Sequence, residues 1–320
     1  MSLPNRSRAS DWPSIPYSDW VDTCTTLHLW AQIVGKIRMV QTPWTNHSWH
    51  VPLYVTTRGL GTSPIAHGAR SFDIDFDFID HQLVVRTAEG DQRHLALEPR
   101  SVADFYQALM ALLDELELPV TIHTTPNEIA DAVPFDQDTE HASYDGEAAR
   151  RFWRALVQVD RVLEEFRAQF HGKHSPVHFF WGSFDLAATR FSGREAPPHP
   201  GGVPNFPDWV AREAYSHEVW SAGFWAGGGG VDEAMFYAYA YPKPDGLENW
   251  PIEPAAASWH ADLGEFVLPY AAVAEADSPD EVLLEFLTSS YDAAAGLAEW
   301  DREALDFAPH PDARTAVEDV

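Results

Sequence analysis

The strict alternation of apolar and acidic residues in FDIDFDF, residues 72–78, constrains the fold more than any other feature of this chain. Successive side chains of a strand point to opposite faces of a sheet, so the three phenylalanines and Ile74 share one face. The aspartates then occupy the other face, where solvent and ion pairs hold them. Read through residue 87, the pattern predicts one strand with a buried face and a solvated face.

Helical patterns precede and follow this strand, and the same order returns in the second half of the chain. We expect helices at 19–41, 101–118, 146–172 and 278–300, and strands at 49–60, 72–87, 120–124, 176–191, 217–225, 234–242 and 264–270. Strands grouped between helices are typical of an α+β fold, in which antiparallel sheets carry helices packed on one face. The repeated order also suggests two similar halves.

An acidic segment separates the two groups of elements. Residues 127–149 contain seven acidic side chains and no lysine or arginine. We interpret residues 1–320 as a single structural unit with sub-halves 1–135 and 146–308, which this segment joins. The tail, 309–320, is expected to be loose.

Composition excludes several classes of protein. The 21 basic and 49 acidic residues give a net charge of −28, which repels nucleic acid. A single cysteine allows neither an intrachain disulfide nor a cysteine-based zinc site, and the histidines show no metal-ligand spacing. No apolar run is long enough to span a membrane, and we expect a cytoplasmic protein without a membrane partner. Cofactor and oligomeric state stay open.

Residues 175–194 mix apolar and reactive side chains most densely. In a strand, Trp181 and Asp185 share one face and His178 points to the other. Asp185, Arg190 and Arg194, at the polar end, suit a site that grips an anion. The alternative is an internal arginine–aspartate ion pair that orders the end of the strand.

A second candidate region reads YSHEVWSAGFWAGGGG, residues 215–230. If the helix that begins after Pro207 continues through His217, then Glu213 and His217 lie one turn apart and can share a proton. If a strand has begun by residue 216, His217 and Glu218 point to opposite faces. The four glycines lack the Gly-Lys-Ser/Thr ending of a phosphate loop, so they predict a hairpin connection or a lid hinge.

Several distinctive strings resemble a bacterial family catalogued only as a domain of unknown function. The resemblance rests on GKHSPVHFFWGSFDL (172–186) and EAYSHEVWSAGFW (213–225), with weaker strings over nearly the whole chain. It implies a single-unit soluble protein and assigns no activity, cofactor or catalytic residue. The departure is WAGGGG, where the family pattern leads us to expect tryptophan followed by proline.

These observations favour an enzyme that acts on a small polar or anionic molecule in an aromatic-lined pocket. His217 or His178 would serve as acid or base, oriented by Glu213 or Glu218. Trp181, Asp185, Arg190, Arg194 and Glu218 are the candidate ligand-binding residues. A non-catalytic ligand-binding protein and an interaction protein without a site are the alternatives that the sequence leaves open.

Overall fold

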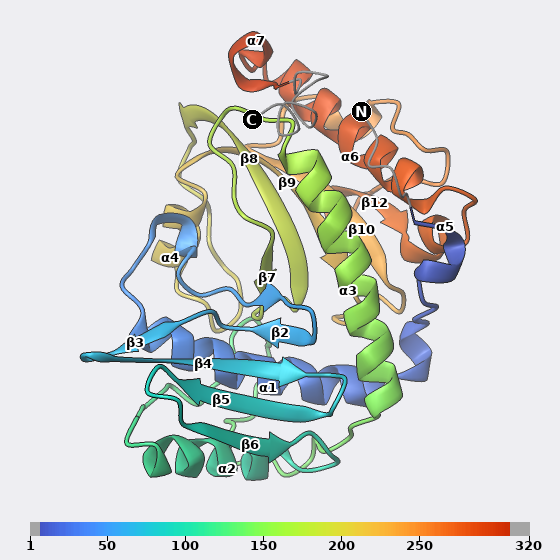
Figure 1. The fold of residues 1–320 in the computed structure, drawn as a ribbon. Helices are drawn as coiled ribbons and strands as arrows, with labels where there is room; N and C mark the ends of the chain where they lie inside the picture. The colour runs from blue at the N-terminus through green and yellow to red at the C-terminus, as the bar shows by residue number, and fades with distance from the viewer. Residues whose placement is uncertain (1–6, 308–320) are drawn as a thin grey trace, which may run out of the picture.

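A computed structural model describes residues 7–307, and it confirms the α+β fold, with two antiparallel sheets (Figure 1). The first sheet has the strand order β1-β2-β4-β5-β6, and β3 pairs with β4. Its strands are β1 (Tyr54–Val55), β2 (Gly59–Gly61), β3 (Ile65–His67), β4 (Arg70–Asp77), β5 (Gln82–Thr87) and β6 (Gln92–Ala96). Helix α1 (Val21–Gln41) precedes this sheet, and helix α2 (Val102–Glu115) follows it.

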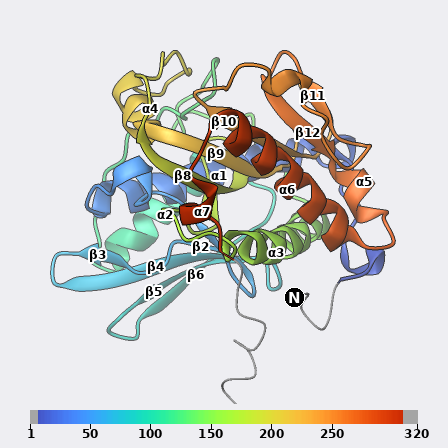
Figure 2. The ribbon, with the colours of Figure 1, turned by 90° about the horizontal axis from the view of Figure 1, so that it is seen from above.

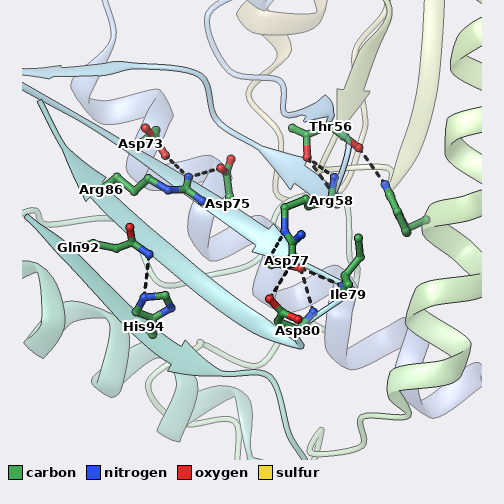
Figure 3. Close-up of polar contacts among 12 residues, drawn as sticks. Thr56, Arg58, Asp73, Asp75, Asp77, Ile79, Asp80, Arg86, Gln92 and His94 are labelled. Carbon is green, nitrogen blue, oxygen red and sulfur yellow. Dashed lines mark hydrogen bonds and ion pairs between the residues drawn. The ribbon is translucent and has the colours of Figure 1, made fainter. Parts of the chain in front are cut away.

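The prediction of a single strand over 72–87 is wrong, because β4 and β5 form a hairpin. Asp77 ends β4, and its carboxylate accepts hydrogen bonds from the backbone N–H groups of Ile79 and Asp80 at 2.9 and 3.0 Å. These bonds favour a turn over continued extension. The solvated face holds the expected ion pairs, since Arg86 bridges Asp73 and Asp75 (Figure 3).

The second sheet has the order β11-β12-β10-β9-β8-β7. Its strands are β7 (His178–Phe180), β8 (Asp185–Glu195), β9 (His217–Trp225), β10 (Met235–Tyr241), β11 (Ser258–His260) and β12 (Glu265–Pro269). Helices α3 (Gly146–Arg167) and α6 (Pro279–Leu297) cover one face, where Trp220 packs against Phe166 and Tyr291. The other face receives α4 (Asp208–Ala214), as Figure 2 shows from above.

Short elements complete the chain. They are the helices α5 (Tyr270–Ala274) and α7 (Arg302–Leu305) and the single 3-10 turns η1 (Ala9–Asp11), η2 (Tyr17–Asp19), η3 (Asn46–Ser48) and η4 (Leu247–Asn249). The strand predicted at 120–124 is wrong, because residues 116–145 contain neither helix nor strand. The tail at 309–320 lies outside the described residues. Within residues 7–307, no helix combines the length and apolarity that a membrane span requires.

The two halves share one hydrophobic core. Leu53, just before β1, exchanges two backbone hydrogen bonds of 2.9 Å with Phe179 of β7. The buried cluster around them runs from α1 and the first sheet into α3, the second sheet and α6. Helices α1 and α4 and the long connections cover the free face of the second sheet. The cavities described next lie between these segments and the sheet.

Candidate functional site

Two neighbouring cavities lie on the face of the second sheet that α3 and α6 leave free. The larger, about 860 Å³, is lined by three acidic side chains and is called the acidic cavity: Glu128, Asp185 and Glu265, with Tyr237 and Tyr239. The smaller, about 650 Å³, is lined mainly by aromatic and aliphatic side chains and is called the aromatic cavity. Asp185 and Glu128 line both, so the two cavities share a wall.

Asp185 stands at the start of β8, and Tyr237 of β10 reaches it across the intervening strand. The Tyr237 hydroxyl donates a short hydrogen bond to the Asp185 carboxylate. Gly223 of β9 lies directly beneath the tyrosine, and a Cβ there would come within 2.5 Å of the Tyr237 hydroxyl. A side chain at position 223 would block this route, so the glycine in the string SAGF is what allows the contact.

Glu128 is held by its neighbours in a conformation that few residues adopt. Its φ is 63°, in the left-handed region that costs a non-glycine residue free energy. Gln32 of α1 fixes the preceding residue, because its side chain accepts from the Asn127 N–H and donates to the Asn127 carbonyl. Ser183 donates to the Glu128 carboxylate at 2.5 Å. Strain that the surrounding contacts enforce is typical of functional sites.

Burial raises the pKa of all three carboxyl groups. It raises the pKa of Asp185 to about 7, where the Tyr237 hydrogen bond opposes the shift and the charge of Glu128 adds to it. Burial, with a further contribution from the charge of Asp185, raises the pKa of Glu265 to about 7. The pKa of Glu128 is raised by burial and partly restored by Ser183. Carboxyl groups that titrate near neutral pH can both give and take protons.

Tyrosines and a histidine form the aromatic side of the acidic cavity. The hydroxyls of Tyr215 and Tyr239 lie 2.7 Å apart, and the ring of His199 stacks on Tyr215 at 4.7 Å. Burial raises the pKa of Tyr215 to about 12, so its phenol keeps its proton at neutral pH. Burial also lowers the pKa of His28 of α1, which lines the same cavity and contacts Phe184, to about 4, so its imidazole is neutral.

Two of the side chains singled out from the sequence line the cavities. Asp185 lines both, and Trp181 lines the aromatic cavity. The single strand predicted over 176–191 is wrong, because β7 and β8 form an antiparallel hairpin with residues 181–184 in its turn, so Trp181 and Asp185 do not share a strand face. The Trp181 indole donates to the Val51 carbonyl at 2.9 Å, and its ring occupies the space that a side chain at Gly35 of α1 would need. Trp181 is thus fixed between α1 and the segment that precedes β1.

Glu213 and His217 meet around a third residue, His47, which lines the aromatic cavity. Glu213 accepts hydrogen bonds from the backbone N–H of His47 at 2.9 and 3.0 Å, and the His217 ring lies 6.0 Å from the His47 ring. Because α4 ends at Ala214 and β9 begins at His217, the two residues do not share a helix face. The expected link between Glu213 and His217 is indirect and runs through His47.

His178 and Arg190 are packed away from both cavities. Burial lowers the pKa of His178 to about 3, and its ring contacts Trp49 and Tyr54. Arg190 points to the α3 face of β8, where its guanidinium lies 3.7 Å from the centroid of the Phe166 ring and 4.5 Å from that of Tyr291. Neither is among the cavity-lining residues, and Arg190 has no carboxylate partner among the described residues.

Arg194 and Glu218 form an ion pair at the far end of β8. Their side chains approach to 2.7 Å, and Arg194 also donates to the carbonyls of Ala298 and Glu299 after α6. Neither residue lines either cavity. The contacts tie the end of the second sheet to the end of α6.

Sequence reasoning missed most of the acidic cavity. Glu128 and Glu265 carry no local signal, since one lies in an irregular connection and the other begins a short strand. The tyrosines do carry a signal, because Tyr237, Tyr239 and Tyr241 alternate along a strand and so share a face. Glycines 227–230 connect β9 to β10 directly, which confirms the hairpin connection.

Within residues 7–307, no group of three or more histidine, cysteine or acidic side chains has an arrangement that could hold a metal ion. No curated protein matches the chain, and no solved structure matches it either. A family model described as a family of unknown function does match, over residues 12–307. Because this match covers most of the chain, the chain belongs to this family of unknown function, DUF5996.

Proposed function

We propose that the protein is an enzyme whose active site is the acidic cavity, where Asp185 and Glu265 transfer protons to and from a small polar substrate. The observation that supports this most is the placement of Asp185, which lines the cavity, accepts from Tyr237 and lies within electrostatic reach of Glu128 and Glu265. Because the acids hinder one another's ionisation, one carboxyl can hold a proton while another has lost it.

The lining favours an uncharged or cationic substrate. Among the described residues that line the acidic cavity there is no lysine or arginine. The carboxylates can accept hydrogen bonds from hydroxyl or amino groups of a substrate, and the phenol rings offer a face for it to pack against. The proposal keeps the small polar substrate expected from the sequence, and it moves the acid–base role from His217, His178 and Glu213 to the carboxyl pair.

Tyr237 is a positioning residue in this proposal. Its hydroxyl fixes one oxygen of Asp185 and leaves the other for the substrate. A carboxyl held in one orientation transfers a proton without first reorganising. Ser183 and the hydrogen bonds of Gln32 to Asn127 hold Glu128 in place. When Glu128 is ionised, its charge raises the pKa of Asp185; when it is protonated, that influence is lost.

Turnover of a panel of neutral hydroxylated compounds and small amines by the purified protein tests the proposal. Wild type should show a bell-shaped pH profile near neutrality. Asp185→Asn should lower turnover by about 10² to 10⁴, the usual contribution of general acid–base catalysis. Asp75→Asn, on the solvated face of the first sheet, is the matched control and should behave as wild type. Equal turnover by Asp185→Asn and wild type would contradict the proposal.

A non-catalytic protein that binds a cationic ligand is the second candidate. Rings of Tyr215, Tyr241 and His199 cluster within 5.3 Å of one another, beside the carboxyl groups. Such a combination can hold an ammonium ion. Binding of an amine without chemical change, weakened in Asp185→Asn, would support this candidate over the enzyme. We also propose a cytoplasmic location. The net charge of −28 further argues against a nucleic-acid partner, because it repels phosphate groups.

A further inference from the structure

The aromatic cavity differs in character from its acidic neighbour. It lies between α1, α4 and the free face of β8, and apolar side chains make up most of its wall: Met39, Trp49, Phe180, Trp181, Phe206 and Val210. A volume of about 650 Å³ with a mainly apolar lining is typical of a small-molecule site. The site proposed above does not use these side chains.

Two tryptophans on this wall are unusually exposed. Trp44 and Trp209 are 47% and 58% exposed, and their rings lie 5.0 Å apart. Both line the cavity, Trp209 from α4 and Trp44 from the connection after α1. Large aromatic side chains left in solvent at the edge of a cavity offer stacking surface to a planar ligand.

Lys36 supplies a buried positive charge on the same wall. Its side chain is almost fully buried, and its ammonium donates to the carbonyls of Thr125 at 2.5 Å and His123 at 3.2 Å. Burial lowers its pKa to about 8, so it remains mostly charged at neutral pH. The Lys36 ammonium lies 5.5 Å from the centroid of the Phe135 ring, and it forms no ion pair with any residue between 7 and 307. An ammonium has a third hydrogen to donate, and an anion at this point would neutralise a charge that carbonyls and one ring face but no carboxylate balances.

The distribution of lysines also indicates that the aromatic cavity is the more favourable place for an anion. The chain has only three lysines, at 36, 173 and 243, and carries a net charge of −28. Lys36 lines the aromatic cavity, and the amine of Lys173 lies 5.2 and 4.9 Å from the ring centroids of Trp49 and Phe191, which also line it. The acids on this wall, Asp185 and Glu128, lie on the side shared with the acidic cavity.

We propose that the aromatic cavity binds a planar aromatic carboxylate, with its carboxylate on Lys36 and its ring system against the cavity tryptophans. The ammonium provides the charge-assisted hydrogen bond, and the apolar wall provides the buried area. The inference does not rest on the function proposed for the acidic cavity, because Lys36 and Trp209 line the aromatic cavity alone.

Titration of the full-length protein with 2-naphthoate and with its uncharged amide, 2-naphthamide, tests the proposal. Calorimetry and quenching of tryptophan fluorescence measure the affinities. Wild type should bind the carboxylate at least about tenfold more tightly than the amide, as a charge-assisted contact predicts. Lys36→Met should abolish this preference, whereas Lys243→Met, which changes a surface lysine paired with Glu248, should retain it. Equal affinities for the two compounds in wild type would overturn the proposal.

Trp209→Ala provides a test that does not depend on a buried substitution. Its side chain is more than half exposed, so the variant should fold, and it should weaken both compounds by a similar factor while the preference for the carboxylate remains. Unchanged affinity in Trp209→Ala would place the ligand elsewhere and overturn the proposal. Glu265→Gln separates the two cavities, since Glu265 lines the acidic cavity and not the aromatic one; it should lower turnover in the acidic cavity and leave the preference for naphthoate over naphthamide in place.

Discussion

The surroundings of Asp185 favour its protonated form. Burial and the nearby charge of Glu128 raise its pKa to about 7, against the opposing hydrogen bonds from Tyr237 and from its own backbone N–H. The unfolded chain releases this proton near pH 4. Between these values the folded protein holds a proton that the unfolded chain has lost, so ionisation of Asp185 destabilises the fold as pH rises.

We therefore expect Asp185→Asn to flatten the pH dependence of stability. Wild type should lose more unfolding free energy than the variant between about pH 4 and about pH 8, because asparagine has no proton to release. Urea denaturation across this range measures the difference. Asp75→Asn, whose carboxylate is paired with Arg86 in the first sheet, is the control and should keep the wild-type slope. Parallel curves for wild type and Asp185→Asn would show that Asp185 ionises normally.

Single residues were predictable only in part. Trp181 and Asp185 both line a cavity, but the strand alternation along 175–194 that singled them out is absent, because Trp181 lies in the turn between β7 and β8. His217 and Glu213 lie near the aromatic cavity but contact it through His47, whose participation no local pattern indicates. Glu128 joins the site because Gln32, 96 positions earlier, clamps its neighbour. Such long-range contacts depend on the tertiary fold.

The packing of strand β9 against its neighbours depends on a glycine, which has no side chain, at position 223. Its glycine at position 223 leaves the space that Tyr237 crosses, and a methyl group there would lie 2.3 Å from the Leu186 carbonyl and 2.5 Å from the Tyr237 hydroxyl. Both neighbours would have to move, and one of them is backbone. The pairing of β8, β9 and β10 therefore requires glycine at this position.

Gly223→Ala should destabilise the protein by about 1–3 kcal/mol, the usual cost of overpacking. Gly296→Ala is the matched control, because position 296 is exposed in α6 and a Cβ there meets nothing within 4 Å. Replacing a helical glycine should stabilise the protein by about 0.5–1 kcal/mol. Chemical denaturation of the two variants should give shifts of opposite sign, and a stabilised Gly223→Ala would refute the steric account.

Long elements were predictable from the sequence and short ones were not. The four long helices lie at or within a few residues of the predicted ranges, since amphipathic periodicity over many residues averages out local exceptions. The strands β3, β6 and β11 were missed, and three predicted strands each merged two observed ones: 49–60 merged β1 and β2, 72–87 merged β4 and β5, and 176–191 merged β7 and β8. Each is short or joined by a tight turn, and its pairing partner decides its conformation more than its own residues do.

Across the whole molecule, the two sheets are joined by a common core. Trp181 packs on α1, Leu53 pairs with Phe179, and the buried cluster is continuous between the halves. We expect one cooperative unfolding transition, with equal calorimetric and van't Hoff enthalpies, because neither half can expose its side of the core alone. Differential scanning calorimetry measures both enthalpies. Two separated transitions would show instead that residues 1–135 and 146–308 fold independently.

The pairing of Leu53 with Phe179 also bears on how the molecule behaves at high concentration. Strands β1 and β7 end their respective sheets, and unpaired strand edges are templates for pairing with other chains. Here the two edges meet, so backbone groups that could recruit a second molecule are occupied within the first. The junction therefore removes these two edges, although not those of β6 and β11, from pairing with other molecules, as well as holding the two halves together.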